Sequence, residues 1–539
     1  MRKYLRFVRG LMKYFKNRIK PEEAIAKATT LLSERYAARN GNFLNLIEKG
    51  VFGYKKSPYL PLLEAKKITY ADVKKWVENE GIETALVRLH REGVYFTVDE
   101  FKGKIPVKRG GVSFTCAEKM FDNPFLAVAY EVRSGATRSA GTRIRIDFDY
   151  LVQRSLYDAF LLNIHDVLTA PIANWFPLFP GAPGINSSLR FSHIGNPPKK
   201  WFSQVKKAQI KVNWEKRLGT ELIFFIGRLY GVPLAKPEYV NLNYAHTVAQ
   251  WAATMVAEHG TCVVYTFATS AVRVCMAAAE AGLNIKGVRF LVTGEPLTAQ
   301  KKTEIEAAGA IAVPVYGISE AGVIAAGCNR HSAISDDCHL FKDTTAVIPH
   351  QHQVEHFDTT VNSFLFTSLL YEAPKLLLNV GMGDYGTVEE KPCDCAFGKI
   401  GFHTHLSRIR SYEKLTGEGV TFVDTDFIRI IEKDLPHLFG GASTDYQLIE
   451  EEDAKGISHL HLIVSPRLNG IDEDKIVESF IGLLKTSEAS PESWAQSGTV
   501  MWNQARTLRV KREFPVATAS GKILPFHLVR RQTVAPTIM

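Results

Sequence analysis

The feature that most constrains the fold is a regular alternation of short apolar runs with helical segments between residues 260 and 318. The runs GTCVVYTF, VRFLVTG and IAVPVYG have the length and composition of buried strands. The segments VRVCMAAAEAGL and AQKKTEIEAAGA, which lie between them, have helical composition. Strands that alternate with helices form βαβ units, so the sequence predicts a largely parallel sheet.

The chain is long enough for more than one domain. It has 539 residues, of which 46% are hydrophobic and 23% charged, a composition that can bury a core. Helices and connectors are expected over residues 20–110. Beyond the alternating region, strands and helices mix with the acidic stretch IEEEDAKGISH over the length of one small domain. We therefore expect an α/β fold, with a large N-terminal α/β domain of mostly parallel sheets (residues 1–407) and a small α+β C-terminal domain (residues 408–539).

The first twenty residues carry eight lysines or arginines and no acid. Their apolar residues recur at helical spacing, which predicts a helix that is basic on one side and apolar on the other. Such a helix either lies on an anionic membrane surface or packs on its own domain, and packing is the more common outcome. No apolar run reaches the length of a membrane span. A nucleic-acid partner is not expected, because the basic cluster is confined to one end and lacks interleaved aromatic residues.

Seven cysteines, an odd number in a long chain, argue against a disulfide scaffold and for a reducing compartment, so a cytoplasmic location is expected. Cys393 and Cys395 form a Cys-x-Cys pair in the segment KPCDCAFGK, which begins about fifty residues after the segment GCNRHSAISDDCHLF that contains Cys328. With one further ligand they would make a tetrahedral, thiolate-rich zinc site. The alternative is that the thiols are buried and pack as small hydrophobes. Three residues compete for the fourth position: His331, Cys338 and His339.

Polar groups follow several expected strands. In an open parallel sheet, ligands bind outside the carboxyl ends of the strands, so these groups are expected to share one crevice. Tyr316 offers a flat face for a base, Glu320 a carboxylate for Mg²⁺, and Asp384 a carboxylate for ribose hydroxyls. The loop in EVRSGATRSAGTRIR, residues 131–145, has the small residues, hydroxyls and arginines that suit phosphate oxygens. Taken singly, the loop reads equally well as an ordinary turn, and for each strand end an ordinary strand-to-helix turn is the favoured interpretation.

Taken together, these segments carry a resemblance. SGATRSAGT, TGEPL, YGISEAG, GMGDYG, SRIRSYEKLTG and ASGKI occur in the order of the motifs of the adenylate-forming superfamily of acyl-CoA synthetases and adenylation domains. The chain looks most like the phenylacetate-CoA ligase branch and its acyl-protein synthetase relatives. The resemblance implies ATP-dependent formation of an acyl-adenylate with release of pyrophosphate, followed by acyl transfer to a thiol. It also implies that the C-terminal domain is mobile and that coenzyme A is the acceptor.

The same resemblance implies roles for individual residues. Lys522, in ASGKI, would contact the substrate carboxylate and would be catalytic together with Glu320 and Arg408. Ser411 would stand at the hinge. ATP and AMP contacts would come from Ser134, Gly135, Thr137, Gly294, Glu295, Pro296, Tyr316, Gly317, Ser319, Asp384 and Lys414.

Other expectations are broader. Members of the same branch have a similar Cys/His arrangement, which favours a structural zinc held by Cys328, His339, Cys393 and Cys395. The substrate would be an aryl or fatty acid in a pocket bordered by Trp175, Phe176, Tyr265 and Phe267. The alternative acceptors are a carrier-protein or enzyme thiol and an amine. Because Asn379 and Gly381 replace two arginines of the family pattern, a non-catalytic relative is also an alternative.

Overall fold

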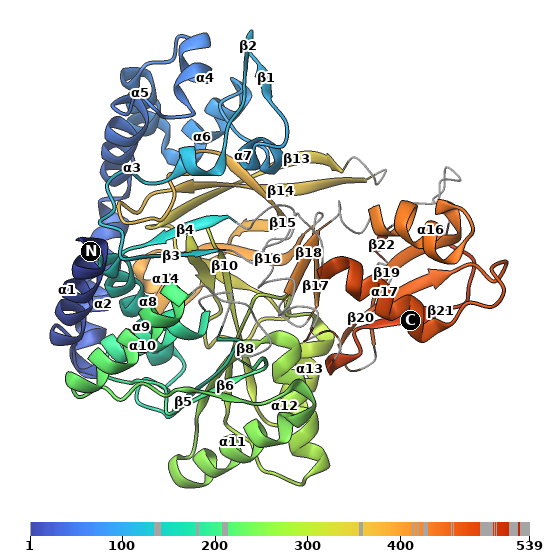
Figure 1. Ribbon diagram of the computed structural model, residues 1–539. Coiled ribbons are helices and arrows are strands. Elements are labelled where there is room, and N and C mark those ends of the chain that lie inside the picture. The colour runs from blue at the N-terminus through green and yellow to red at the C-terminus, as the bar shows by residue number, and fades with distance from the viewer. Residues whose placement is uncertain are drawn as a thin grey trace, which may run out of the picture.

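The computed structural model comprises a large body and a smaller C-terminal unit beside it (Figure 1). The residues that it describes are 2–133, 142–178, 183–206, 214–354, 359–411, 414–417, 420–423, 429–453, 455, 457–485, 500, 502, 504–516 and 526–528.

The large body is organised around a twelve-stranded sheet among the described residues. One half is parallel and has the strand order β10-β9-β8-β5-β6-β7. Its centre arises from the alternating segments, because strands separated by a helix return in the same direction. The strands of this half are β5 (Ile172–Trp175), β6 (Lys200–Ser203), β7 (Pro237–Tyr239), β8 (Val263–Phe267), β9 (Arg289–Thr293) and β10 (Ile311–Ile318).

The other half of the sheet is antiparallel and extends from β10 in the order β11-β12-β16-β15-β14-β13. The alternation of strands and helices did not reveal this half, because no helix follows most of its strands. The α/β class with a parallel sheet and an added small domain is confirmed. The antiparallel strands are β11 (Gly322–Ala326), β12 (Cys338–Leu340), β13 (Thr345–Val354), β14 (Thr359–Ser368), β15 (Val380–Glu390) and β16 (Thr404–Ser411).

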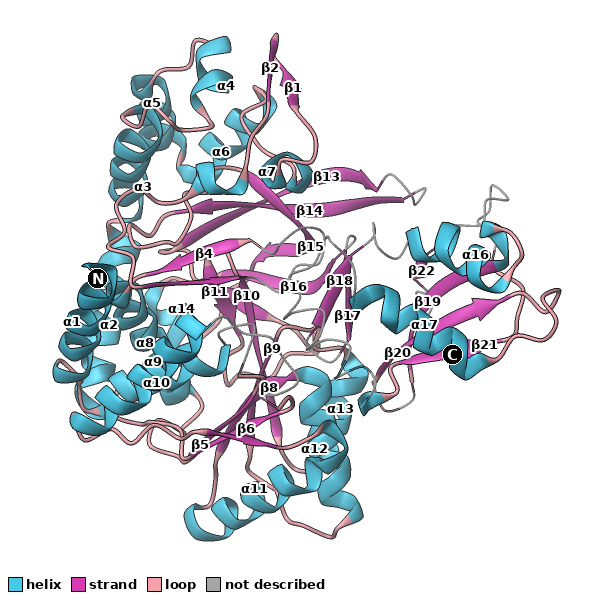
Figure 2. Ribbon diagram, in the orientation of Figure 1, coloured by secondary structure: helices cyan, strands magenta, loops and turns pink. Residues whose placement is uncertain are grey.

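Helices cover both faces of the parallel half (Figure 2). On one face lie α8 (Phe148–Ile164), α9 (Pro183–His193) and α10 (Trp214–Leu229), and on the other α11 (Ala245–His259), α12 (Ala268–Glu280) and α13 (Ala299–Ala307). The Asp147 carboxylate caps α8 by accepting a 2.7 Å hydrogen bond from the Asp149 backbone. Strands buried on both faces read as continuous apolar runs, which is why the sequence pattern was clear here.

The N-terminal region is helical, as expected. Its helices are α1 (Arg2–Lys16), α2 (Pro21–Ala37), α3 (Arg39–Ile47), α4 (Leu60–Ala65), α5 (Tyr70–Glu80), α6 (Ile82–Arg91) and α7 (Val98–Lys102). Phe7, Leu11 and Phe15 of α1 are buried, so this helix packs on its own domain. Two hairpins follow, β1 (Val107–Arg109) with β2 (Val112–Phe114), and β3 (Tyr130–Arg133) with β4 (Arg143–Ile146).

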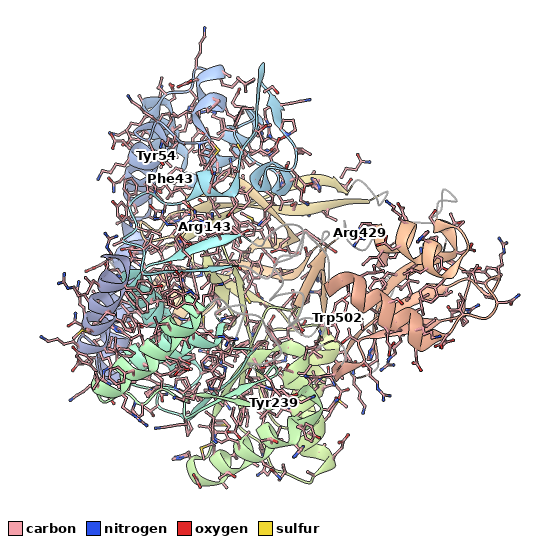
Figure 3. All side chains as sticks on the ribbon, in the orientation of Figure 1. Phe43, Tyr54, Arg143, Tyr239, Arg429 and Trp502 are labelled. Atoms are coloured by element: carbon pink, nitrogen blue, oxygen red, sulfur yellow. The ribbon has the colours of Figure 1, made fainter. Side chains whose placement is uncertain are left out.

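The C-terminal unit has its own four-stranded sheet in the order β21-β20-β19-β22. Arg429 and Trp502 lie in this unit, whereas Arg143 lies on β4 of the large body (Figure 3). The amide of Gln504 joins the two parts by donating to Gln204 O at 3.2 Å. The remaining α-helices and strands of the described residues are α14 (Ala396–Ile400), β17 (Lys414–Gly417), β18 (Val420–Val423), α16 (Leu435–Phe439), β19 (Tyr446–Glu452), β20 (Ser458–Val464), α17 (Glu473–Lys485), β21 (Leu508–Lys511) and β22 (Phe526–Leu528).

Two expectations concern the chain as a whole. A helix that could cross a membrane is not found in the described part of the chain. β16 continues through Arg408 to Ser411 and pairs with β15, so the large sheet extends past residue 407. The division of the chain at residues 407 and 408 stays a prediction.

Candidate nucleotide site and metal cluster

The structure brings Tyr316 and Asp384 together. Tyr316 lies near the end of β10 and Asp384 on β15, and three strands separate β10 from β15 in the sheet order. The Tyr316 hydroxyl nevertheless donates a hydrogen bond of 2.9 Å to Asp384 Oδ2. Burial and the neighbouring Asp384 carboxylate raise the pKa of the Tyr316 phenol well above its ordinary value, so the phenol stays a neutral donor. An aromatic ring and a carboxylate from two different strands thus lie side by side.

Glu320 lies in the turn between β10 and β11 and is buried. Its carboxylate Oε1 lies 3.6 Å from the Lys102 ammonium, and the two side chains are only 8% and 7% exposed. Lys102 ends α7, a short helix fixed by a capping box between Thr97 and Glu100. A buried carboxylate needs a counter-charge, and here a lysine from the N-terminal region supplies it. Ser319, in the same turn, and Gly317, near the end of β10, are exposed.

The Gly294-Glu295-Pro296 turn follows β9. Gly294 has a φ of +76°, and a Cβ there would lie 3.0 Å from the Phe267 ring, so only glycine fits without strain. Glu295 turns inward: its carboxylate accepts a 2.8 Å hydrogen bond from Thr269 N at the start of α12 and lies 3.9 Å from Lys301 Nζ. The carboxylate therefore caps α12, and a nucleotide contact by this turn stays a prediction.

The segment that contains Arg408 and Ser411 is the end of β16. Arg408 is exposed and has a φ of +52°, a left-handed conformation that is unfavourable for a residue with a Cβ. The buried Asp336 carboxylate holds it there by accepting hydrogen bonds from the backbone of Arg408 (2.8 Å) and Ile409 (2.9 Å). Ser411 Oγ donates to Gly383 O at 2.9 Å, next to Asp384.

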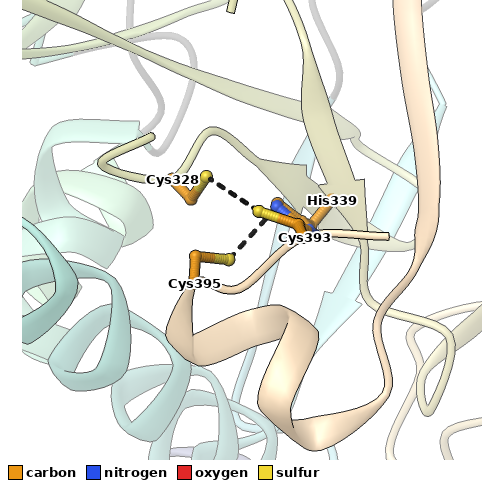
Figure 4. Close-up of side chains that lie close together, drawn as sticks. All are labelled: Cys328, His339, Cys393 and Cys395. Carbon is orange, nitrogen blue, oxygen red and sulfur yellow. Dashed lines mark hydrogen bonds between the residues drawn. The ribbon is translucent and has the colours of Figure 1, made fainter. Parts of the chain in front are cut away.

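Cys328, His339, Cys393 and Cys395 form a cluster (Figure 4), in which one ligand atom from each residue lies within 4.8 Å of all the others. Cys328 Sγ lies 3.9 Å from Cys393 Sγ, and Cys395 Sγ lies 3.3 Å from His339 Nε2. The hydrogen bond with the Cys395 thiol, with His339 also contributing, lowers the pKa of Cys328 against the opposing effect of burial. The seven cysteines are all free.

His339 is oriented for ligation. Its Nδ1 donates to Phe402 O at 2.6 Å, which leaves the Nε2 lone pair directed at the cysteines. Of the three residues that competed for this position, only His339 belongs to the cluster. The thiol of Cys338 contacts Pro314 O at 3.7 Å instead. Adjacent strand residues point to opposite faces, so Cys338 and His339 of β12 cannot both face the cluster.

Beneath the strand ends lies a small cavity of about 10 Å³. It is lined by Tyr265 of β8, by Leu291 and Val315 of the next two strands, and by Arg154 and Asp158 of α8. Arg154 is 4% exposed, and in the described part of the chain its guanidinium has no hydrogen bond or ion pair but lies 4.6 Å from the Tyr157 ring centroid. This space is the size of one water molecule, and its wall contains one basic and one acidic residue, Arg154 and Asp158.

Three of the four residues predicted to border an acyl pocket lie together. The Phe176 ring centroid is 5.0 Å from those of Tyr265 and Phe267. The fourth, Trp175, is buried, and its indole nitrogen donates to Val240 O. The pocket itself stays a prediction.

Several predicted residues lie outside the described part of the chain: Ser134, Gly135, Thr137 and Lys522. The first three fall between β3 and β4, and Lys522 falls shortly before β22. Lys414 begins β17, and its side chain is also outside the described residues.

The residues that sequence reasoning missed are Lys102 and Asp336. Both contact predicted site residues from distant parts of the chain. Lys102 stands in a helical region without a motif, so no local signal could have found it. Asp336 lies in the stretch SDDC between two cysteines, where acidic residues also fit a surface loop.

Comparison with solved structures defines the class of fold. No family model and no curated protein matches the chain. Over 92% of this chain and 90% of the other, the structure superposes on an adenylate-forming CoA ligase with a TM-score of 0.52 and 14% sequence identity. The chain therefore has the fold of adenylate-forming ligases.

The structure that gives this superposition is 2-hydroxyisobutyryl-CoA ligase in complex with 2-HIB-AMP and CoA in the thioesterification state. A weaker superposition, with a TM-score of 0.40 and 12% identity, covers 74% of this chain and 68% of o-succinylbenzoate CoA synthetase from Bacillus subtilis. Another, with a TM-score of 0.41 and 11% identity, covers 83% of this chain and 95% of malonyl-CoA ligase.

Proposed function

We propose that this protein activates a carboxylic acid with ATP and transfers the acyl group to the thiol of coenzyme A. In the first step a carboxylate oxygen attacks the α-phosphorus of ATP and pyrophosphate leaves with the electrons of the broken P–O bond. In the second step a thiolate sulfur attacks the acyl carbonyl and AMP leaves. The observation that carries the proposal is the Tyr316–Asp384 hydrogen bond, because it places an aromatic face beside a carboxylate.

Each of the proposed site residues would have its own role in binding ATP or in the reaction. Tyr316 would stack on the adenine and Asp384 would accept the ribose hydroxyls. Arg408 would act together with Lys522, which would supply a fixed cation where charge builds on the reacting oxygens. A Mg²⁺ ion, when bound, would neutralise phosphate oxygens, and a carboxylate oxygen such as that of Glu320 is a ligand that Mg²⁺ prefers. The Lys102 ammonium shows that Glu320 already accommodates a cation.

For the acid, we propose a short one. The cavity beneath the strand ends has room for a single water molecule and is walled by Arg154 and Asp158, so a long alkyl chain would have to displace buried charged groups. The 2-hydroxyisobutyryl-CoA ligase of similar fold is named for a short hydroxy acid. Aryl and fatty acids remain the wider candidates.

We also propose a structural zinc in the Cys328–His339–Cys393–Cys395 cluster. In a tetrahedral site with Zn–S bonds of about 2.3 Å, neighbouring sulfur atoms are about 3.8 Å apart. The Cys328–Cys393 separation of 3.9 Å is close to this value, so the chemistry and spacing of the ligands fit zinc. The same Cys/His set supports placing the chain near the phenylacetate-CoA ligase branch.

The decisive experiment is pyrophosphate release from ATP with a panel of short, aryl and long-chain acids, with and without coenzyme A. Release with a short acid, and a thioester only when coenzyme A is present, is the expected result. Pyrophosphate release followed by acyl transfer to a carrier-protein thiol or to an amine would move the assignment to those acceptors. Silence across the panel with folded protein and Mg²⁺ would favour a non-catalytic relative.

Substitution of Lys522 tests in which of the two steps this lysine acts. Lys522→Ala should abolish adenylate formation and leave transfer from a supplied acyl-adenylate nearly intact, because the lysine acts only in the first step. Lys475→Ala, at an exposed lysine of α17, is the control and should leave both steps unchanged. Equal loss in both steps would refute the role of Lys522.

A further inference from the structure

The helices α1 and α10 lie side by side at the surface and run in the same direction. Near their beginnings the Tyr4 phenol lies beside the Glu215 carboxylate. Just past their ends Arg18 Nη2 donates to Tyr230 O at 2.8 Å. Because the contacts occur in the same order along both helices, the two are parallel neighbours, as the ribbon also shows (Figure 1).

Both helices are anchored by their inner faces. On α1 the buried residues include Leu11 and Phe15, and on α10 they include Ile223 and Phe224. A Cβ placed on Gly227 of α10 would lie 3.3 Å from the Phe15 ring, so the helices pack closely. The two helices are therefore a fixed part of the domain, and their outer faces keep one orientation.

The outer face of α10 is apolar. Trp214, Leu218, Phe225 and Leu229 are 66%, 43%, 60% and 66% exposed. At about 100° per residue they fall within an arc of about 60°, so they form one continuous stripe. Leu5 (49% exposed) and Met12 (40% exposed) of α1 lie seven residues apart on one side of that helix. A soluble surface rarely presents so many large apolar side chains in one place, and such patches mark interaction sites.

The same two helices are strongly basic. Only two exposed acids, Glu215 and Glu221, lie on them in the described part of the chain, and Glu221 is 3.8 Å from Lys236. The exposed bases of the two helices and of the turn after α1 are Arg6, Arg9, Lys13, Lys16, Arg18, Lys216, Arg217 and Arg228. The surface thus combines an apolar stripe with a large excess of positive charge.

We propose that this surface, the outer face of α1 and α10, binds an anionic membrane surface. Aromatic and aliphatic side chains of an interfacial helix enter the boundary between headgroups and acyl chains, while lysines and arginines contact anionic headgroups. Exposed Trp and Phe beside Lys and Arg is the arrangement that such an interface requires. Most of the apolar side of α1 is buried in its own domain, so α10 supplies most of the exposed apolar side chains of this surface.

A second copy of the chain and a nucleic acid fit this surface less well than a membrane does. In a two-fold dimer the same patch would meet itself, so eight bases would face eight bases across the interface. Nucleic acid would use the charges but would leave the apolar stripe exposed to water. A lipid surface satisfies both parts of the patch at once. An acidic protein partner could also match the charge of this surface, and comparing vesicle binding with binding of an acidic protein distinguishes the two.

The test is co-sedimentation of the full chain with vesicles of phosphatidylcholine, with and without phosphatidylglycerol, at low and high salt. We expect binding only to the anionic vesicles and at least a ten-fold weaker partition at high salt. The fluorescence of Trp214 should shift to the blue on binding, and this shift should disappear in Trp214→Phe.

Two surface variants separate the contributions. Phe225→Ser/Leu229→Ser and Lys13→Glu/Lys16→Glu should each weaken binding at least ten-fold without lowering the thermal midpoint, because these side chains are exposed. Matched controls elsewhere on the surface, Leu438→Ser and Lys74→Glu/Lys75→Glu, should bind like the wild type.

Three outcomes would overturn the proposal. Equal binding to neutral and anionic vesicles, or none, would exclude anionic lipid. Dimerisation that Phe225→Ser/Leu229→Ser abolishes would assign the face to a second copy. Binding of a purified acidic carrier protein without binding of vesicles would assign it to a protein partner.

Discussion

Tyr316 donates its hydroxyl to Asp384 across three intervening strands, so the aromatic ring and the carboxylate are held in one geometry before any ligand arrives. Tyr316→Phe keeps the ring and removes only the hydrogen bond. A hydrogen bond to a charged carboxylate contributes about 1.5–3 kcal/mol, so the KM for ATP should rise at least about ten-fold with little change in kcat. Asp384→Ala, which removes the carboxylate, should raise the KM further. Pyrophosphate exchange at varied ATP measures both, and tighter ATP binding by Tyr316→Phe would contradict the arrangement.

Lys102 should compete with Mg²⁺ for Glu320. Removing the ammonium in Lys102→Met takes away the positive charge 3.6 Å from the buried Glu320 carboxylate, so the free energy of unfolding should fall. The same vacancy should lower the Mg²⁺ concentration needed for half-maximal activity several-fold. Lys104→Met is the control, because that lysine pairs with Asp99 at a partly exposed position. A Mg²⁺ requirement that stays the same or rises in Lys102→Met would exclude Glu320 as the magnesium ligand.

The metal cluster predicts one equivalent of zinc in the purified protein. The Cys393→Ser/Cys395→Ser variant should lose the metal and melt at a lower temperature, because structural zinc sites contribute directly to folding. Cys262→Ala/Cys275→Ala changes two buried thiols outside the cluster and should retain the metal. Elemental analysis and thermal unfolding measure these effects, and a stable wild-type protein without metal would refute the site.

Asp343 makes stability depend on pH. Burial raises the pKa of this carboxyl to about 6, against the hydrogen bond from Tyr157 and the nearby Arg35 and Arg154. Between about pH 4 and pH 6 the unfolded chain has lost a proton that the folded protein keeps, so unfolding releases a proton and stability falls as pH rises. The loss amounts to about 2–3 kcal/mol.

Asp343→Asn removes this titration. The stability of the variant relative to the wild type should therefore increase from pH 4 to pH 6 and then level off. Asp474→Asn, at an exposed position of α17, should show no such trend. Denaturant unfolding at a series of pH values measures the difference, and parallel curves for wild type and Asp343→Asn would contradict the assignment.

A structural feature could be predicted from the sequence where the residues of that one segment are enough to identify it. The runs that become β8, β9 and β10 are continuous and apolar because both faces are buried, so their parallel pairing could be predicted. β15 changes along its length from buried to exposed, and only the five-residue helix α14 separates it from β16, so neither its length nor its antiparallel pairing could be predicted from the sequence. The strand period of two could have excluded that Cys338 and His339 both face the cluster, but it could not have said which of the two does.

Charge pairing was the hardest part to foresee. Lys102 and Glu320 are far apart in the sequence, and each alone reads as an ordinary surface charge. Only the packing of α7 against the turn after β10 makes them a buried pair. The same holds for Asp336, whose backbone contacts fix the end of β16.

Substitutions of Arg408 should change the stability and the activity of the protein independently, because this residue combines a left-handed backbone conformation with a side chain predicted to be catalytic. Its φ of +52° is maintained by the Asp336 carboxylate and is easier for glycine than for any residue with a Cβ. Arg408→Gly should therefore raise the free energy of unfolding by about 0.5–1 kcal/mol and still slow the overall reaction. Arg408→Ala should slow the reaction equally without the gain in stability, since alanine retains the strain. Thermal unfolding and thioester formation measure the two effects, and full activity in both variants would exclude a catalytic role for Arg408.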